Sequence, residues 1–404
     1  MSKELLALNG GSKSINKNFD WPIFDENEIN AVEEVLRSGN WGSPNCQDKV
    51  AAFERAYAEF CGTKYAVSCV NGSVSLRIAL IASGIQPGDE VIVPPYTFIA
   101  TASTVIECNA VPVFVDISLD TFNMDPDKIE AAITPRTKAI VPVHFGGLAC
   151  DMDRILSIAE KHGLTVIEDA AHAHGAAYKG KMLGSLGKAG SFSFQSSKNM
   201  TSGEGGVVVT NDEKMYKMMS SLRNVGREEH GQWYDHFNAG CNYRITQMQA
   251  VLLSEQLKRL ESQTQKRHNN GNYLAGLLEN IEGITPLKRN IGETINSYHL
   301  FIFRYDPAGF GGLSRDEFVA HLNAEGVPCI KGYPYPLYKQ PLFQEKRFMC
   351  YAIPAEVDYT NVSCPVAEQV CNESVWILQN ALLGEKEDMD AFAEAILKIQ
   401  NAYR

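Results

Sequence analysis

Along the first 210 residues, short apolar runs alternate with longer stretches in which apolar residues recur at helical spacing. The runs predict strands at residues 65–70, 90–93, 111–117, 138–143, 164–168, 190–194 and 207–210. The periodic stretches predict helices at residues 25–38, 47–60, 74–83, 100–108, 125–133 and 151–162. Because strands buried on both faces read as continuous apolar runs, this alternation indicates an α/β fold with a mostly parallel sheet.

A long amphipathic pattern at residues 246–281 separates this part of the chain from the remainder. After it, the sequence predicts a strand at 300–303, a helix at 314–325, a Pro-rich loop at 332–341 and a helix at 386–402. This mixture is typical of a smaller α+β domain. We therefore divide the chain into an N-terminal arm (1–20), a large domain (21–258) and a small C-terminal domain (259–404).

Composition narrows the functional classes. The chain has 404 residues, enough for two domains, and a formal net charge of −11, which argues against a nucleic-acid or anionic-membrane partner. No apolar run has the length of a membrane span and no signal peptide is evident, so we expect a cytoplasmic protein. Ten cysteines without a C-x-x-C pair favour reduced thiols. His172 and His174 suggest no third ligand, and we expect no metal.

Lys198 is the residue around which the candidate chemistry gathers. It lies between the runs at 190–194 and 207–210 and is followed by Gly203, Gly205 and Gly206. Glycines let the backbone turn sharply and approach a ligand closely. A lysine at such a turn can form a Schiff base with a carbonyl, although a solvated loop lysine fits the same pattern.

Other candidates stand where predicted strands end, the edge at which parallel sheets bind ligands. Gly72 and Ser73 open a helix, where they form either an anion site or an ordinary N-cap. Phe98 either stacks on a planar ring or belongs to the core. Asp169 either protonates a ring nitrogen or caps a helix, and Ser193 can bind a phosphate. Together these groups are what pyridoxal phosphate requires.

The same residues give the chain a resemblance to the DegT/DnrJ/EryC1/StrS aminotransferase family. The segments that carry it are 72–73, 94–98, 141–144, 168–171, 193–206, 240–244 and 333–337. The resemblance covers almost the whole chain, and it implies a fold-type I pyridoxal-phosphate transferase with a seven-stranded, mostly parallel sheet. It also implies a homodimer with shared active sites.

The resemblance implies a role for each candidate. Lys198 forms the internal aldimine with pyridoxal 5′-phosphate and moves the substrate proton. Asp169 pairs with the pyridine nitrogen, and Phe98 stacks on the ring. A phosphate site is implied at Gly72, Ser73 and Ser193. Asn242 is similar to the asparagine that reaches the cofactor phosphate of the neighbouring subunit.

Two positions depart from the usual family pattern. His172, near the phenolic oxygen of the cofactor, stands where most members have glutamine, as in members that make an aminohydroxybenzoate. Gly332 stands where sugar-modifying members have histidine. The Gly-Gly arm at residues 10–11 and the segment 375–384 resemble the branch that aminates scyllo-inosose or its deoxy relative with glutamine.

We therefore predict a ping-pong aminotransferase that moves an amino group from glutamine or glutamate to a cyclic ketone, a keto-cyclitol or keto-sugar. The alternatives are a nucleotide keto-sugar aminotransferase, an enzyme like aminohydroxybenzoate synthase, and a regulatory protein on the same scaffold. Lys198 argues against a dehydratase, since the dehydratases of the family resemble this chain with histidine there. Substrate selectivity is expected in the loops 39–44, 225–238 and 331–338.

Overall fold

The computed structural model describes residues 5–42 and 48–404. Its largest sheet has seven strands in the order β1-β9-β8-β5-β4-β2-β3, with β9 antiparallel to both neighbours and the other pairs parallel. The strands are β1 (Tyr65–Cys69), β2 (Glu90–Val93), β3 (Val111–Phe114), β4 (Thr137–Ile140), β5 (Thr165–Asp169), β8 (Ala189–Ser193) and β9 (Gly206–Thr210). The predicted mostly parallel sheet is therefore confirmed.

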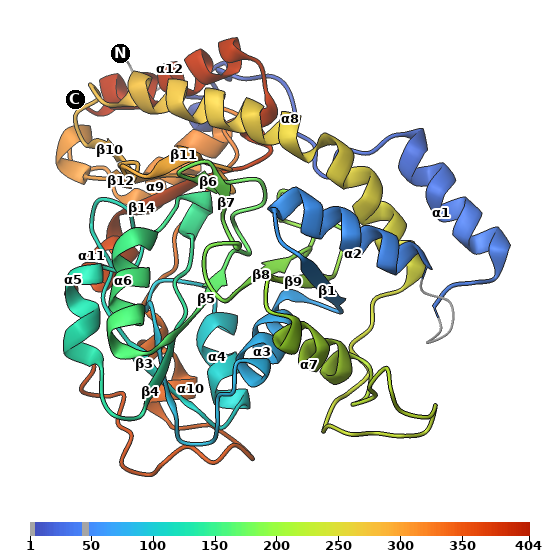
Figure 1. Cartoon of the computed structure of the whole chain (residues 1–404). Coiled ribbons are helices and arrows are strands. Elements are labelled where there is room, and N and C mark those ends of the chain that lie inside the picture. The colour runs from blue at the N-terminus through green and yellow to red at the C-terminus, as the bar shows by residue number, and fades with distance from the viewer. Residues whose placement is uncertain (1–4, 43–47) are drawn as a thin grey trace.

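Helices cover both faces of this sheet (Figure 1). On one face pack α2 (Asp48–Cys61), α6 (Met152–His162) and the long α8 (Gln247–Leu278), and on the other α3 (Gly72–Ala82), α4 (Ala100–Glu107) and α7 (Glu213–Arg223). Along β9, Val207 and Val209 face the first layer and Val208 the second. Burial on both faces explains why the strand is a run of β-branched residues.

A second sheet of four antiparallel strands, in the order β10-β12-β14-β13, lies at the other end of α8 (Figure 1). Its strands are β10 (Ile284–Pro286), β12 (Leu300–Tyr305), β13 (Cys329–Lys331) and β14 (Ser374–Leu378). Its core is shared with α9 (Arg315–Ala324) and α12 (Lys386–Tyr403). The remaining α-helices of the described residues are α1 (Glu26–Ser38), α5 (Pro126–Ile129), α10 (Pro341–Gln344) and α11 (Pro365–Glu373), and a small third sheet consists of β11 (Glu293–Ile295), β6 (Ala177–Tyr178) and β7 (Lys181–Met182).

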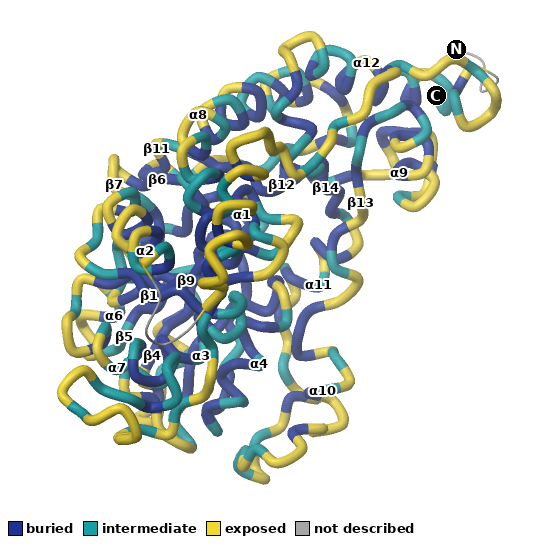
Figure 2. The backbone as a smooth tube through the Cα atoms, turned by 90° about the vertical axis from the view of Figure 1, so that its right-hand side faces the viewer, coloured by how far each residue is buried: buried dark blue, intermediate teal, exposed yellow. Residues whose placement is uncertain are grey.

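Helix α8 joins the two sheets, and the expected domain boundary at residue 258 falls inside it. The segment that contains Leu337, Phe343 and Tyr359 lies far beyond this boundary, yet it packs against the core of α3 and α4. The tube in Figure 2 shows that the buried backbone is concentrated in the strands and their flanking helices. The division at residues 20 and 258 stays a prediction.

Some elements were not expected from the sequence. Helix α7 begins directly after Asp212, whose side chain accepts a hydrogen bond from the Met215 N–H. The Asn211-Asp212 pair therefore follows the end of β9 and also provides the N-cap of α7. Within the part of the chain that the structure describes, no helix is both long and apolar enough to cross a membrane.

Candidate active site

A cavity of about 720 Å³ opens at the carboxyl ends of β2, β5 and β8. Its walls come from both sheets, since Ile330 of β13 and Trp376 of β14 line it opposite residues of the large sheet. Seven of the eight predicted site residues line it: Gly72, Ser73, Phe98, Asp169, His172, Ser193 and Lys198. The topology therefore gathers residues that are more than a hundred positions apart in the sequence.

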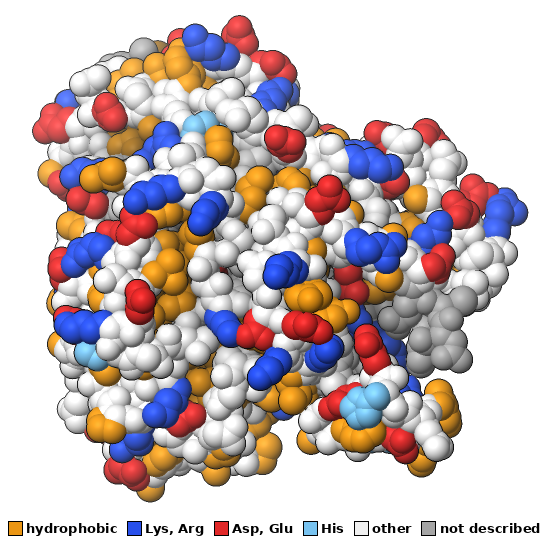
Figure 3. Space-filling model, in the orientation of Figure 1, with side chains coloured by type: hydrophobic (Ala, Val, Ile, Leu, Met, Phe, Trp, Pro, Cys, Tyr) orange, Lys and Arg blue, Asp and Glu red, His pale blue; other side chains and the backbone are white. Residues whose placement is uncertain are grey.

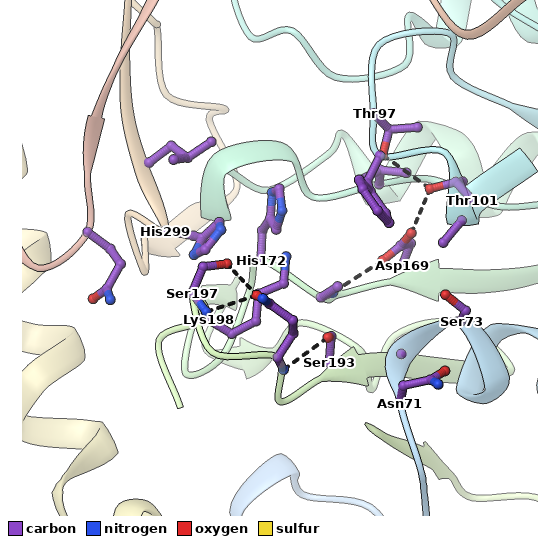
Figure 4. Close-up of a pocket in the computed structure, with 18 of the residues that line it drawn as sticks. Asn71, Ser73, Thr97, Thr101, Asp169, His172, Ser193, Ser197, Lys198 and His299 are labelled. Atoms are coloured by element: carbon purple, nitrogen blue, oxygen red, sulfur yellow. Dashed lines mark hydrogen bonds between the residues drawn. The ribbon is translucent and has the colours of Figure 1, made fainter. Parts of the chain in front are cut away.

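Asp169 is the last residue of β5, and only 5% of its surface is exposed. Its Oδ2 accepts a hydrogen bond of 2.8 Å from Thr101 Oγ1, and its Oδ1 accepts one of 3.2 Å from the Ala171 N–H (Figure 4). Burial raises the pKa of Asp169, and these two hydrogen bonds oppose the rise. The carboxylate is thus fixed in direction and ready for a positively charged partner.

Lys198 comes from the turn after β8 and lines the same cavity (Figure 4). Burial lowers the pKa of Lys198 to about 8, and the charge of Asp169 offsets part of this shift. A substantial fraction of the amine is therefore neutral near physiological pH. A neutral amine is the nucleophilic form.

The first turn of α3 closes one end of the cavity. Asn71 caps the helix by accepting a 2.9 Å hydrogen bond from the Val74 N–H. The N–H groups of Gly72 and Ser73 have no hydrogen-bond partner among residues 5–42 and 48–404. A Cβ at Gly72 would lie 2.7 Å from Ser193 Cβ, so glycine is required for β8 to approach the helix. These free N–H donors, together with the hydroxyls of Ser73 and Ser193, suit an anion.

Two buried histidines, His172 and His299, lie beside Lys198 (Figure 4), and their ring centroids are 4.2 Å apart. His172 Nδ1 accepts a hydrogen bond from the Gly146 N–H, so the proton of the neutral ring is on Nε2. Burial lowers the pKa of both His172 and His299 well below its usual range, which keeps both rings neutral.

His299 has the opposite tautomer. The Asn199 amide donates from Nδ2 to the Ser297 carbonyl, so its Oδ1 faces His299 Nδ1 at 3.0 Å. Nδ1 of His299 therefore carries the proton, and Nε2 is left as an acceptor. The two rings next to Lys198 differ in character, one offering a donor and the other an acceptor.

Asn242 is the predicted site residue that the structure leaves outside the cavity. It is exposed and forms an isolated β-bridge with Asn224. Of the expected selectivity loops, residues 43 and 44 lie outside the described residues, and Tyr333 of the 331–338 loop lines the cavity.

The polar lining residues for which the sequence suggested no role include Thr101, His299, Gln379 and Asn380. Thr101 lies within a helix and His299 directly before β12, while Gln379 and Asn380 fall in the segment 375–384, whose resemblance gave these two residues no role. His299 had a signal of its own, as the single histidine directly before the predicted strand at 300–303.

The sequence model of the DegT/DnrJ/EryC1/StrS aminotransferase family matches residues 22–396. The chain belongs to this family. A protein of Streptomyces kanamyceticus is 40% identical over 100% of this chain and 99% of its own length. It carries the provisional name L-glutamine:3-amino-2,3-dideoxy-scyllo-inosose aminotransferase.

Solved structures agree with this assignment. The crystal structure of 3-amino-5-hydroxybenzoic acid synthase has a TM-score of 0.85 at 35% identity, over 94% of this chain and 97% of that chain. NtdA of Bacillus subtilis with bound cofactor PMP has a TM-score of 0.81 at 27% identity, over 96% of this chain and 87% of that chain. The fold-type I class and the aminotransferase activity predicted from the sequence are confirmed.

Proposed function

We propose that this aminotransferase uses pyridoxal 5′-phosphate to move an amino group from glutamine or glutamate to an uncharged keto-cyclitol. The observation that carries the proposal is the cavity that brings Lys198, Asp169 and the first turn of α3 together. The resemblance assigns these groups to the aldehyde, the ring nitrogen and the phosphate of one cofactor. Its bound amine form, PMP, is present in the similar NtdA structure.

The residues fit this cofactor. The free N–H groups of Gly72 and Ser73, with the Ser73 and Ser193 hydroxyls, suit its phosphate. The Nε2 proton of His172 suits the phenolic oxygen, which explains how histidine replaces the glutamine usual in the family, because both side chains donate. When bound, pyridoxal phosphate supplies an electron sink that lets a substrate Cα lose its proton.

The protein's own residues then do three things. The buried Lys198 amine would hold the cofactor through its aldehyde carbon and, as a free amine, would accept the proton of the substrate Cα. Asp169, oriented by Thr101, keeps the ring nitrogen protonated and thereby stabilises the charge that develops in the ring. Phe98, which lines the cavity and is 58% exposed, would cover the ring face.

The charge of the cavity lining favours a neutral ketone over a nucleotide keto-sugar. Among the described residues that line it, Lys198 is the only lysine or arginine, and Asp169 and Glu204 are acidic. The diphosphate of a nucleotide sugar would meet no arginine among these residues. A keto-cyclitol needs only hydrogen-bonding groups, and the relative in Streptomyces kanamyceticus is named for such a substrate.

A homodimer with shared active sites is part of the proposal. Aromatic side chains stand out on the 225–238 loop, where Trp233 is 65% and Tyr234 is 75% exposed. The lobe at the lower right of Figure 3 shows histidine and hydrophobic side chains together at the surface. Aromatic surface of this kind is typical of an interface. Asn242 lies near the end of this loop, and the resemblance assigns it to the cofactor phosphate of the partner.

The proposal is tested in two half-reactions. Purified protein with pyridoxal phosphate is given L-glutamine, and the absorbance of the cofactor is followed as its aldehyde form becomes its amine form. Scyllo-inosose and, separately, a nucleotide keto-hexose are then added. We expect scyllo-inosose alone to restore the first spectrum. Restoration by the nucleotide sugar alone would transfer the chain to the sugar branch, and no change with glutamine or glutamate would overturn the aminotransferase proposal.

The pKa of Lys198 predicts how cofactor uptake depends on pH. The amine loses its proton with a pKa of about 8, so the neutral fraction rises about tenfold per pH unit below pH 8 and then levels off. The rate at which the cofactor-free protein binds pyridoxal phosphate covalently should follow the neutral fraction of Lys198 as the pH changes. Stopped-flow absorbance between pH 6 and 10 measures it. A rate that climbs steadily up to pH 10 would show an ordinary, solvated lysine.

A further inference from the structure

Gln379, directly after β14, is a cavity-lining residue whose side chain is held in one orientation. It is 3% exposed, and its Oε1 accepts hydrogen bonds from Arg267 Nε at 2.9 Å and from Arg267 Nη2 at 2.5 Å. Arg267 comes from the middle of α8. The two residues are 112 positions apart, and this contact links the long helix to the cavity wall.

The guanidinium decides which end of the amide faces the cavity. Arginine has only donors, so the amide atom that faces it is oxygen. The nitrogen Nε2 is therefore at the other end of the amide, and no hydrogen bond joins it to any described residue. The adjacent Asn380 differs, because its Nδ2 already donates to the Phe19 carbonyl. Gln379 thus presents an unused N–H donor at the cavity.

Burial of the Arg267 guanidinium lowers the stability of the fold. It is fully buried, no carboxylate of the described residues lies within ion-pair distance, and its Nη1 has no hydrogen-bond partner there. The ring of Trp21, another lining residue, lies 5.3 Å from its Cζ. Burying an unpaired cation is unfavourable. Its charge, however, polarises the Gln379 amide and makes Nε2 a stronger donor.

We propose that Gln379 determines specificity by donating a hydrogen bond from Nε2 to an oxygen of the bound substrate, and that Arg267 is the residue that positions it. The oxygen is either a ring hydroxyl of the ketone or an α-carboxylate oxygen of the amino donor. Both present the same acceptor to the amide. The inference rests on the proposed function, because both molecules occupy this cavity in turn.

The deciding variant is Gln379→Glu. Glutamate has the same shape and still accepts from Arg267, now as an ion pair, so the fold keeps its contact. It replaces the donor by a carboxylate oxygen, which repels the α-carboxylate of an amino donor and forces a ring hydroxyl that accepted from Nε2 to reverse its own hydrogen bond. We expect the apparent KM for one substrate to rise roughly 10- to 100-fold, with kcat changed much less. A rise in the ketone half-reaction identifies a ring hydroxyl, and a rise in the glutamine half-reaction identifies the carboxylate.

Two further variants separate recognition from structure. Gln265→Glu makes the same charge change on the exposed side of α8 and should leave both KM values unchanged. Arg267→Met removes the buried cation and should raise the same KM without lowering the melting temperature. If Gln379→Glu leaves both KM values within twofold, or if Arg267→Met lowers only the melting temperature, the inference is wrong. The wild-type half-reactions report separately on the proposed function, and if they fail the inference falls with it.

Discussion

Replacing Lys198 with alanine should abolish amino transfer and leave the fold intact. The side chain lies in a cavity and forms no hydrogen bond or ion pair with the described residues, so its removal breaks no structural contact. Proton transfer by a positioned group alone accounts for about 10²- to 10⁴-fold in rate. Loss of the amine that attaches the cofactor adds to this. We expect the rate of each half-reaction to fall by roughly 10⁴-fold or more.

Lys214→Ala is the matched control, because Lys214 is an exposed lysine on α7 outside the cavity. Borohydride reduction followed by peptide mapping gives a second measurement that does not depend on turnover. In the wild type it should label position 198 with the cofactor, and in Lys198→Ala it should label no lysine. Full activity of Lys198→Ala would show that another group carries out the chemistry.

The central sheet could be predicted because its physical cause is local. A strand covered by helices on both faces needs apolar residues at successive positions, as in β9, and a short sequence window contains that signal. The candidate residues followed from it, since they stand where such strands end. Asp169 and Ser193 end β5 and β8, which are neighbours in the sheet.

The rest of the site depends on contacts between distant segments. The role of Gln379 becomes visible only through Arg267, and that of His299 through Asn199. Neither pair has a sequence spacing that a helix or strand would impose. Short strands such as β13, with three residues, also carry too little periodicity to be recognised. Strand β13 belongs to its sheet through antiparallel pairing with β14, not through a local sequence pattern.

Asp169→Asn should lower the rate of both half-reactions while making the cofactor-free protein more stable. Asparagine keeps the shape: its Oδ1 can accept from the Ala171 N–H and its Nδ2 can donate to the Thr101 hydroxyl, but it carries no charge to hold the ring nitrogen protonated. Removing one partner of a buried charge pair costs about 3–5 kcal/mol. That corresponds to a rate loss on the order of 10²- to 10⁴-fold. Single-turnover absorbance measurements with glutamine would give the value.

The effect on stability has the opposite sign. Burial raises the folded pKa of Asp169 above its unfolded value, so the folded state holds its proton to a higher pH than the unfolded chain. The carboxylate's contribution to stability therefore falls as pH rises through that window, and at pH 7 the folded protein carries the cost of a buried charge. Asp169→Asn removes the cost, and the cofactor-free variant should melt at a higher temperature than the wild type.

With pyridoxal phosphate bound, the wild type should instead melt at a higher temperature than Asp169→Asn, because the ring nitrogen gives the buried carboxylate a partner. Saturating cofactor is expected to raise the melting temperature of the wild type more than that of Asp169→Asn. Melting both proteins at pH 7 with and without pyridoxal phosphate measures all four values. A variant that is less stable without cofactor and equally stabilised with it would mean that Asp169 serves the fold through Thr101. If the variant melts higher than the wild type without cofactor and lower with it, the fold keeps an unfavourable buried charge for the sake of cofactor binding.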